Sequence, residues 1–129
     1  MAEMITAADN HIPVCIVLLN NGVLGMVRQM QSLFKEQRYS MTTLRHGGAD
    51  FCAIARGMGA EATRVQTIEE LSEALDRALL AQGDPTTAGP KLIEVPIDKD
   101  EFVTPVLRIG ASMDELIVNM DDVRARMGR

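Results

Sequence analysis

Residues Ile12–Leu19 read IPVCIVLL, and this stretch is the strongest indication of the fold in the chain. It is apolar at nearly every position instead of alternating between apolar and polar residues. A run of this kind is typical of a strand that is buried on both faces in the middle of a parallel sheet. Pro13 fits only near the start of such a strand, where the ladder needs no backbone N–H. We therefore predict that 12–19 forms an interior strand of a parallel sheet.

Helices and further strands are predicted around this stretch from apolar spacing, capping signals and apolar runs. The predicted helices span Glu3–Asn10, Val23–Lys35, Ala49–Met58 and Thr67–Ala81, and a last one opens at Ser112. The other predicted strands are Ala60–Val65, near an edge, and Lys91–Ile97, with loops at 36–48 and 82–89. Helices that alternate with apolar strands predict an α/β fold, a parallel sheet with helices on both faces.

Capping boxes open the last two predicted helices and set which side chains face inward. Thr67 and Glu70 form the first box, and Ser112 and Glu115 form the second. The inward side chains are predicted to be Ile68, Leu71, Leu75, Ala78 and Leu79 in one helix, and Leu116, Ile117, Met120, Val123 and Met127 in the other.

Length and composition limit what the chain can be. With 129 residues, 47% of them hydrophobic and 24% charged, the sequence predicts one soluble domain that spans 1–129. A formal net charge of −5 and only 3% aromatic residues argue against a nucleic-acid partner. No apolar run approaches the ~20 residues that a membrane span needs. No signal peptide is visible either, so a cytoplasmic protein is expected.

The cysteines and histidines offer no metal or nucleophile pattern. Cys15 and Cys52 lie far apart in apolar surroundings, which predicts two buried free thiols in a reducing compartment. His11 and His46 have no partner at the spacing of metal ligands. Neither zinc nor a Cys/His nucleophile pair is expected.

The loop that follows the apolar stretch is the candidate site. Asn20, Asn21 and Gly22 come directly after it, and Gly25 lies in the first part of the next predicted helix. In an open α/β sheet, ligands bind beyond the carboxyl ends of the strands. Free N–H groups at a helix N-terminus favour a phosphate, and asparagine oxygens suit Mg²⁺. A plain turn is the alternative, because Asn-Gly is among the commonest turn dipeptides.

A longer string around this loop resembles the second half of the thiamine-diphosphate motif. The string reads PVCIVLLNNGVLGMVRQ from Pro13 to Gln29. More narrowly, GMVRQ at 25–29 and RYS at 38–40 are similar to the catalytic subunit of acetolactate (acetohydroxyacid) synthases. QSLF at 31–34, DF at 50–51 and GAS at 110–112 match in order, so the resemblance covers Glu3 to about Ile117. It implies that the chain is the later part of a doubly wound, C-terminal thiamine-diphosphate-binding domain, truncated at its N-terminal side.

The resemblance implies roles for residues of the loop. The family's second asparagine binds Mg²⁺, and this position is Asn21; the carbonyl that also binds the metal falls on Val23. Backbone around Gly25 and Met26 would meet the diphosphate. The implied cofactor-binding residues are Asn21, Gly22, Val23, Gly25 and Met26, and the implied substrate-channel residues are Met26 and Met30. No catalytic residue is implied in this chain, because the activating glutamate belongs to the N-terminal domain of a partner subunit.

Three positions depart from the family's pattern. No Gly-Asp-Gly, which supplies the metal-binding aspartate of the motif, precedes Asn20. Met30 stands where the family usually has a tryptophan at the substrate entrance. Arg108 and Ile109 replace the two prolines before Gly-Ala-Ser. The first departure implies that the chain starts inside the helix after Gly-Asp-Gly, and the second bears on the choice of 2-keto acid.

The activity implied by the resemblance is that of acetolactate synthase in branched-chain amino-acid biosynthesis. Pyruvate is decarboxylated and joined to a second 2-keto acid by an enzyme that uses thiamine diphosphate and Mg²⁺, with FAD often held by another domain and not by this region. The implied partners are the remaining domains of the enzyme, a second copy in a homodimer or higher homo-oligomer, and a regulatory small subunit. The isolated chain is expected to be inactive. The alternatives are another thiamine-dependent 2-keto-acid decarboxylase or carboligase, and a noncatalytic interaction domain that keeps the fold.

Some polar residues have a simpler interpretation than a role in the site. Arg28 and Arg38 could meet a substrate carboxylate, but solvated or ion-paired arginines are commoner. Met26 and Met30 are four residues apart, and such pairs more often pack in a core than contact a cofactor. Glu94 stands alone in an apolar strand and is predicted to lie at the strand end or to face outward.

Overall fold

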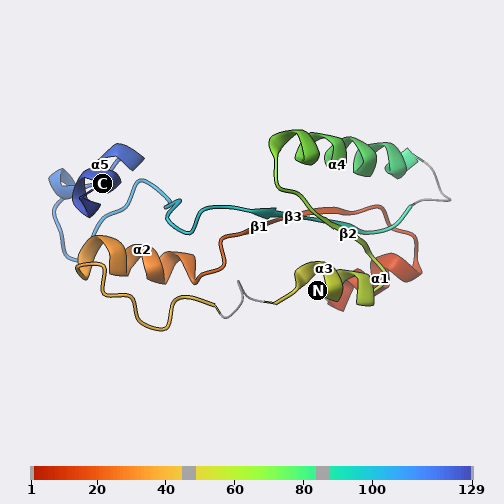
Figure 1. Ribbon diagram of the computed structural model, residues 1–129, viewed down its shortest axis with the longest axis horizontal. Coiled ribbons are helices and arrows are strands. Elements are labelled where there is room, and N and C mark those ends of the chain that lie inside the picture. Colours follow the sequence, from red (N-terminus) through yellow and green to blue (C-terminus); the bar gives the residue numbers. More distant parts are fainter. Residues whose placement is uncertain (1, 45–48, 84–87, 129) are drawn as a thin grey trace. The chain divides into compact units, whose positions relative to one another are not determined.

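The computed structural model describes residues 2–44, 49–83 and 88–128. These residues pack into two compact units, each built from two separate segments of the chain (Figure 1). The first unit joins Met1–Asn20 and Ala49–Ile97, and the second joins Asn21–Gly48 and Asp98–Arg129. His46 and parts of the two loops predicted at 36–48 and 82–89 lie outside the described residues. Among the described helices, none has the length and hydrophobicity needed to cross a membrane.

The first unit is built on a sheet of three parallel strands in the order β1-β3-β2. These strands are β1 (Cys15–Asn20), β2 (Glu61–Arg64) and β3 (Lys91–Pro96). The prediction that 12–19 lies in the sheet interior is therefore wrong, because β3 is central and β1 pairs with β3 alone among the described strands. The parallel direction and the edge position of β2 are confirmed.

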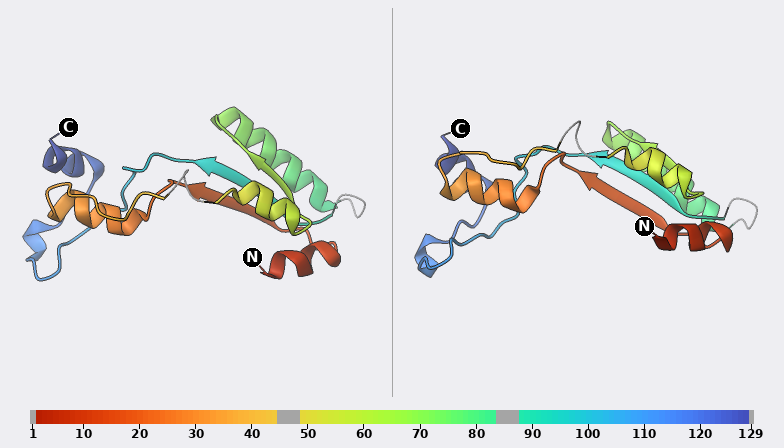
Figure 2. Two further views of the ribbon diagram at one scale, coloured as in Figure 1. Left: turned by 60° about the horizontal axis from the view of Figure 1, so that its bottom comes forward. Right: turned by 90° about the horizontal axis from the view of Figure 1, so that it is seen from below.

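Helices cover both faces of this sheet, as the sequence predicts (Figures 1 and 2). The helices α1 (Ala2–Asp9) and α3 (Phe51–Gly57) lie on one face, and α4 (Ile68–Leu80) lies on the other. Side chains along a strand alternate between faces. Leu92 of β3 accordingly packs in a cluster with residues of α1 and α3, and Ile93 packs in another cluster with Ala74 of α4.

The buried face of α4 differs from the predicted one. Ala74 and Ala78 are buried, and Leu71 and Leu75 pack beside them, whereas Ile68 and Leu79 are exposed. At 3.6 residues per turn, Ile68 and Leu79 lie roughly 100–120° from the midpoint between the two alanines, so they point away from the sheet. Thr67 caps the helix as predicted, since its Oγ1 accepts the Glu70 N–H at 3.1 Å.

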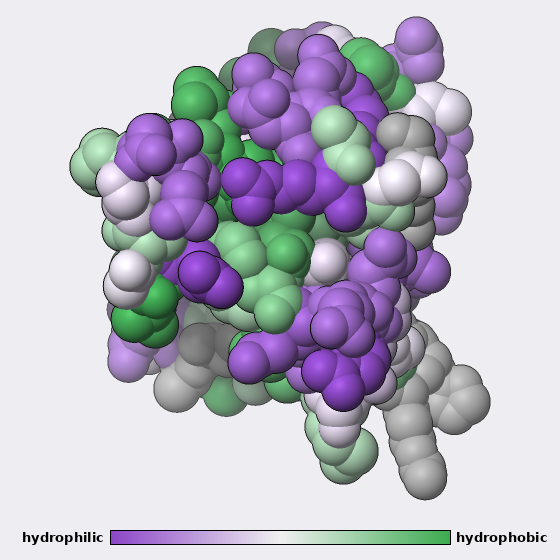
Figure 3. Space-filling view, turned by 90° about the vertical axis from the view of Figure 1, so that its left-hand side faces the viewer, coloured by the Kyte–Doolittle hydropathy of each residue, from purple (hydrophilic) through white to green (hydrophobic). Residues whose placement is uncertain are grey.

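The second unit packs α2 (Gly25–Phe34) against α5 (Met120–Met127). Figure 3 looks at the side on which these helices lie in Figure 1, and hydrophilic residues cover most of that face around smaller hydrophobic groups. The buried core of the unit consists of Phe102, Val106, Ile117, Val123 and Met127.

The last helix begins later than predicted. Ser112 N–H donates to Glu115 Oε1 at 3.2 Å, but the helix opened there is a single 3₁₀ turn at Met113–Glu115. The helix α5 starts after Asn119, whose Oδ1 accepts two backbone N–H groups at 2.9 and 3.0 Å. Ile117 is buried nevertheless, because an isolated antiparallel bridge to Val106 holds it in the core.

The edge strand β1 predicts how the chain behaves in solution. Its residues carry no charge and no proline, and Val17 and Leu19 are exposed on it. An apolar edge without such protection recruits further strands. We expect the molar mass measured by light scattering to rise with protein concentration, and Val17→Lys to restore the monomer mass.

A matched variant tests whether the edge itself is responsible. Leu80→Lys adds the same charge at an exposed leucine of α4 and is expected to leave self-association unchanged. A wild-type chain that stays monomeric at every concentration would contradict this prediction.

Candidate functional site

The loop Asn21–Leu24 is held in place by its own hydrogen bonds. Asn21 Oδ1 accepts the Val23 N–H at 3.2 Å, and Gly22 adopts a left-handed conformation with φ of 65°. The loop also pairs with the segment 42–44. Leu24 N–H donates to the Thr42 carbonyl at 2.8 Å, and Leu44 N–H donates to the Gly22 carbonyl at 3.1 Å. The sequence predicted the loop but not this pairing.

Gly25 begins α2 in close contact with Asn21. A Cβ atom at Gly25 would lie 2.8 Å from Asn21 Nδ2, so a larger residue would displace the asparagine. The residue before the helix, Leu24, provides no side-chain cap, and the first turn carries no acidic residue. The first N–H groups of a helix have no partner inside it. The start of α2 therefore offers uncapped N–H groups and a positive dipole end, which together suit an anion.

Met26 and Met30, the two residues assigned to the substrate channel, have different surroundings. The side chain of Met26 is exposed in the first turn of α2. Met30 is half-buried and packs against the core of the second unit. Packing is thus part of the role of Met30, and the channel assignment of both residues stays a prediction.

Arg28 is buried and ion-paired. Its Nη2 lies 2.8 Å from Asp100 Oδ1, and its Nε donates to the same oxygen at 2.9 Å. The guanidinium carbon lies 4.0 Å from the centre of the Tyr39 ring. Arg38 is exposed and lies 3.9 Å from Glu36. Both arginines are ion-paired, which is the commoner of the two roles considered for them. The burial of Arg28 was not predicted from the sequence.

The sequence belongs with known thiamine enzymes. A family model described as the C-terminal TPP binding domain of thiamine pyrophosphate enzymes matches residues 1–95. The chain belongs to this family. Thiamine pyrophosphate is another name for thiamine diphosphate, so the match agrees with the resemblance in the loop.

Several curated relatives are acetolactate synthases. The chain is 38% identical over 117 residues to the acetolactate synthase large subunit of Corynebacterium glutamicum. This alignment covers 88% of the chain and 18% of that subunit. It is 39% identical over 117 residues to the mitochondrial catalytic subunit of Saccharomyces cerevisiae, covering 91% of the chain and 16% of that subunit. It is 38% identical over 115 residues to the acetolactate synthase isozyme 2 large subunit of Escherichia coli, and this alignment covers 89% of the chain and 20% of that subunit. The chain thus spans about a fifth or less of these relatives.

The residues of the loop fit a diphosphate and a hard cation bound to it. The hydrogen bonds to the 42–44 segment use the Gly22 carbonyl and the Leu24 N–H, and neither uses the Val23 carbonyl. The Val23 carbonyl and the second lone pair of Asn21 Oδ1 are neutral oxygen donors of the kind that Mg²⁺ accepts. Within the described ranges, no group of three or more His, Cys, Asp or Glu side chains is arranged to bind a metal. The two neutral donors of the loop are fewer than the six ligands of Mg²⁺, so phosphate and water oxygens would have to complete the coordination of such a metal.

Glu94 is a buried charged residue whose position was predicted wrongly from the sequence. It lies in the central strand and is only 3% exposed, so the prediction that it faces outward is wrong. Its Oε1 accepts the Asn20 Nδ2–H at 2.7 Å, and its Oε2 accepts the Cys52 S–H at 3.5 Å. Glu94 thereby joins the end of β1, directly before the loop, to β3 and α3. Of the two thiols predicted to be buried, Cys52 is buried and Cys15 only partly.

The thiol of Cys52 is held in its protonated form. Burial raises the pKa of this thiol, and the hydrogen bond and the charge of Glu94 raise it further. A protonated thiol is the form that can donate to the Glu94 carboxylate, so the hydrogen bond is kept at neutral pH.

Replacing Glu94 tests how much its hydrogen bonds with Asn20 and Cys52 stabilise the fold. We expect Glu94→Ala to lower the free energy of unfolding by about 1–3 kcal/mol, because the half-buried Asn20 amide and the buried Cys52 thiol lose the carboxylate oxygens to which they donate. Glu94→Gln retains an oxygen for Asn20 and is expected to lose less. Urea unfolding followed by circular dichroism measures both. Glu73→Ala, at an exposed glutamate of α4, is the control. An equal effect of Glu94→Ala and Glu73→Ala would contradict the role given to the network.

Proposed function

We propose that this chain is the diphosphate- and Mg²⁺-binding part of a thiamine-dependent acetolactate synthase. The observation that carries the proposal is the loop Asn21–Leu24, whose donor atoms lead into the uncapped start of α2. The similarity to acetolactate synthases along most of the chain supports the reaction.

Three residues of the loop and the first two residues of α2 have roles in this proposal. Asn21 Oδ1 and the Val23 carbonyl bind Mg²⁺, and the N–H groups of Gly25 and Met26 bind diphosphate oxygens. Gly22 provides the left-handed turn that brings Asn21 and Val23 together. When bound, thiamine diphosphate supplies the carbon centre at which a 2-keto acid is decarboxylated, and the protein positions it.

The substrates and partners of the whole enzyme are part of the same proposal. The substrates are pyruvate and a second 2-keto acid, and Met26 and Met30 lie beside the channel that admits them. The remaining domains of the enzyme and a second copy complete the site, and a regulatory small subunit binds the assembly. FAD, where the whole enzyme holds it, binds outside this region.

Removing the amide oxygen of Asn21 tests the proposal. In an enzyme that contains these residues within its full chain, we expect Asn21→Ala to raise the Mg²⁺ concentration needed for half-maximal acetolactate formation at least tenfold, or ~1.4 kcal/mol. Asn10→Ala, at an exposed asparagine after α1, is the control and is expected to leave that concentration unchanged.

The product formed from pyruvate separates this proposal from its alternative. Acetolactate supports it, whereas acetaldehyde alone would indicate a decarboxylase. An unchanged Mg²⁺ requirement in Asn21→Ala would remove Asn21 from the metal site.

A further inference from the structure

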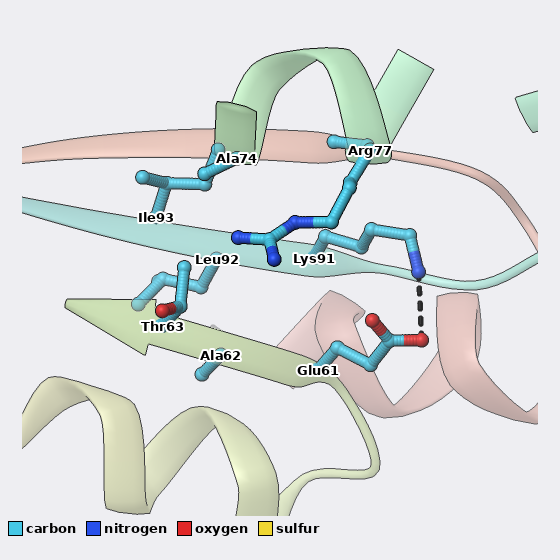
Figure 4. A pocket seen from close by; sticks show the side chains of 9 residues that line it. Glu61, Ala62, Thr63, Ala74, Arg77, Lys91, Leu92 and Ile93 are labelled. Atoms are coloured by element: carbon cyan, nitrogen blue, oxygen red, sulfur yellow. Dashed lines mark ion pairs between the residues drawn. The ribbon is translucent and has the colours of Figure 1, made fainter. Parts of the chain in front are cut away.

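A hollow lies between α4 and the strands β2 and β3 in the first unit (Figure 4). Its volume is about 320 Å³. None of its lining residues belongs to the loop Asn21–Leu24 or to α2. Whatever binds in this hollow therefore uses residues that the proposed function does not use.

Small side chains create this hollow. The helix α4 presents Ala74 and Ala78 to the sheet, and Thr63 of β2 lines the same hollow. Ile93 pairs in register with Thr63 and forms part of the apolar wall. Because the alanines end at Cβ, the helix and the strands leave between them an open hollow that larger side chains would fill; Arg77 and Glu61 at this hollow are exposed to solvent.

Polar groups from three elements surround the same space. In Figure 4 the side chain of Arg77 runs down from α4 toward β3, and its guanidinium points into the space above the strands. At one end, Lys91 Nζ lies 2.7 Å from Glu61 Oε1, and Lys91 and Glu61 are in register on adjacent strands. The hydroxyl of Thr63 lies on the same side.

The charged side chains that line the hollow, Glu61, Arg77 and Lys91, carry a net charge of about +1. Glu61 neutralises Lys91. Arg77 has no ion-pair partner within the described ranges, and Glu73, one turn earlier on α4, does not pair with it. A net positive hollow in a chain of net charge −5 favours a monoanion.

We propose that this hollow binds a small organic carboxylate. The fork of N–H donors on Arg77 matches the two oxygens of a carboxylate. Ala74, Ala78 and Ile93 provide the apolar wall for a short hydrocarbon group. The volume lies at the lower end of the range of ligand pockets, so the ligand has only a few carbon atoms beside its carboxylate.

Titration of the ¹⁵N-labelled chain with isovalerate tests the proposal. Isovalerate joins one carboxylate to a branched four-carbon group. We expect amide shifts at Thr63, Ala78 and Ile93 that saturate with a Kd of about 1–10 mM, as befits a small ligand. Arg77→Gln is expected to weaken binding at least tenfold. Arg64→Gln makes the same charge change at an exposed arginine of β2 outside the hollow, and is expected to leave the Kd unchanged.

Two further probes use the wild-type chain alone. The neutral analogue 3-methylbutan-1-ol and inorganic phosphate are each expected to bind at least tenfold more weakly than isovalerate. Equal binding of the alcohol would overturn the role of Arg77, and equal binding of phosphate would overturn the role of the apolar wall. Absence of shifts with isovalerate would overturn the site itself. The proposed function of the loop is untouched by any of these results.

Discussion

The chain of 129 residues by itself is expected to form no acetolactate and to bind thiamine diphosphate with Mg²⁺ more weakly than micromolar. Mg²⁺ prefers a site that combines carboxylate, phosphate and water oxygens. The loop supplies the amide oxygen of Asn21 and the carbonyl of Val23, and both are neutral. The Gly-Asp-Gly that the resemblance would require for a metal-binding carboxylate does not occur among these residues.

The remaining attraction is too small for tight binding. The positive end of α2 is worth about 0.3–1 kcal/mol for each favourable charge at an exposed site. A micromolar complex needs ~8 kcal/mol. The resemblance assigns the aminopyrimidine ring and the activating glutamate to another domain, so a cofactor held by the loop alone would lack its activating group.

Calorimetric titration of the chain with thiamine diphosphate and Mg²⁺ measures this affinity. Asn21→Ala is the matched variant, and Asn10→Ala is its control. Low-micromolar binding by the wild-type chain that Asn21→Ala abolishes would show that the loop suffices and that the missing aspartate matters less than we expect.

Replacing Arg28 by methionine is expected to lower the free energy of unfolding of the second unit by about 3–5 kcal/mol. The side chains of Arg28 and Asp100 are only 6% and 12% exposed. Removing the guanidinium takes the paired cation from a carboxylate that is largely shielded from water, which costs more than the loss of a surface ion pair. The methionine keeps most of the apolar stem, so the effect reports the charge and not the volume.

Urea unfolding followed by tyrosine fluorescence measures this change. Tyr39 is the single tyrosine and the chain has no tryptophan, so the signal comes from the second unit. Arg38→Met is the matched control: its side chain is 74% exposed, and we expect a loss of about 0–1 kcal/mol. Equal losses in the two variants would mean that the Arg28–Asp100 pair is not desolvated.

Local signals in the sequence predicted most elements correctly. Thr67 caps α4 because its hydroxyl lies within three residues of the N–H that it accepts, and no distant contact is needed. At Ser112 the same local pattern formed only one 3₁₀ turn. There the chain leaves the helix to pair Ile117 with Val106, and this bridge prevails over the helical preference of the capping pattern.

The candidate loop could also be found from the sequence, because its residues are consecutive. Asn21, Gly22 and Gly25 form one local structure, in which the side chain of Asn21 lies against the start of α2. The pairing of the loop with Thr42 could not be predicted, since a single bridge between segments leaves no periodic pattern.

From the sequence alone one could predict an α/β chain with parallel strands, helices on both faces and, after β1, a loop that resembles the thiamine-diphosphate motif. The central position of β3, the inward direction of Glu94 and the pairing of Arg28 with Asp100 became visible only in the folded structure. An apolar run such as Ile12–Leu19 shows that a strand is hydrophobic, but it does not show whether one or two strands pair with it. In a strand that is apolar on both faces, alternation cannot show where Glu94 points. The ion pair joins residues 72 positions apart, and only folding brings such residues together.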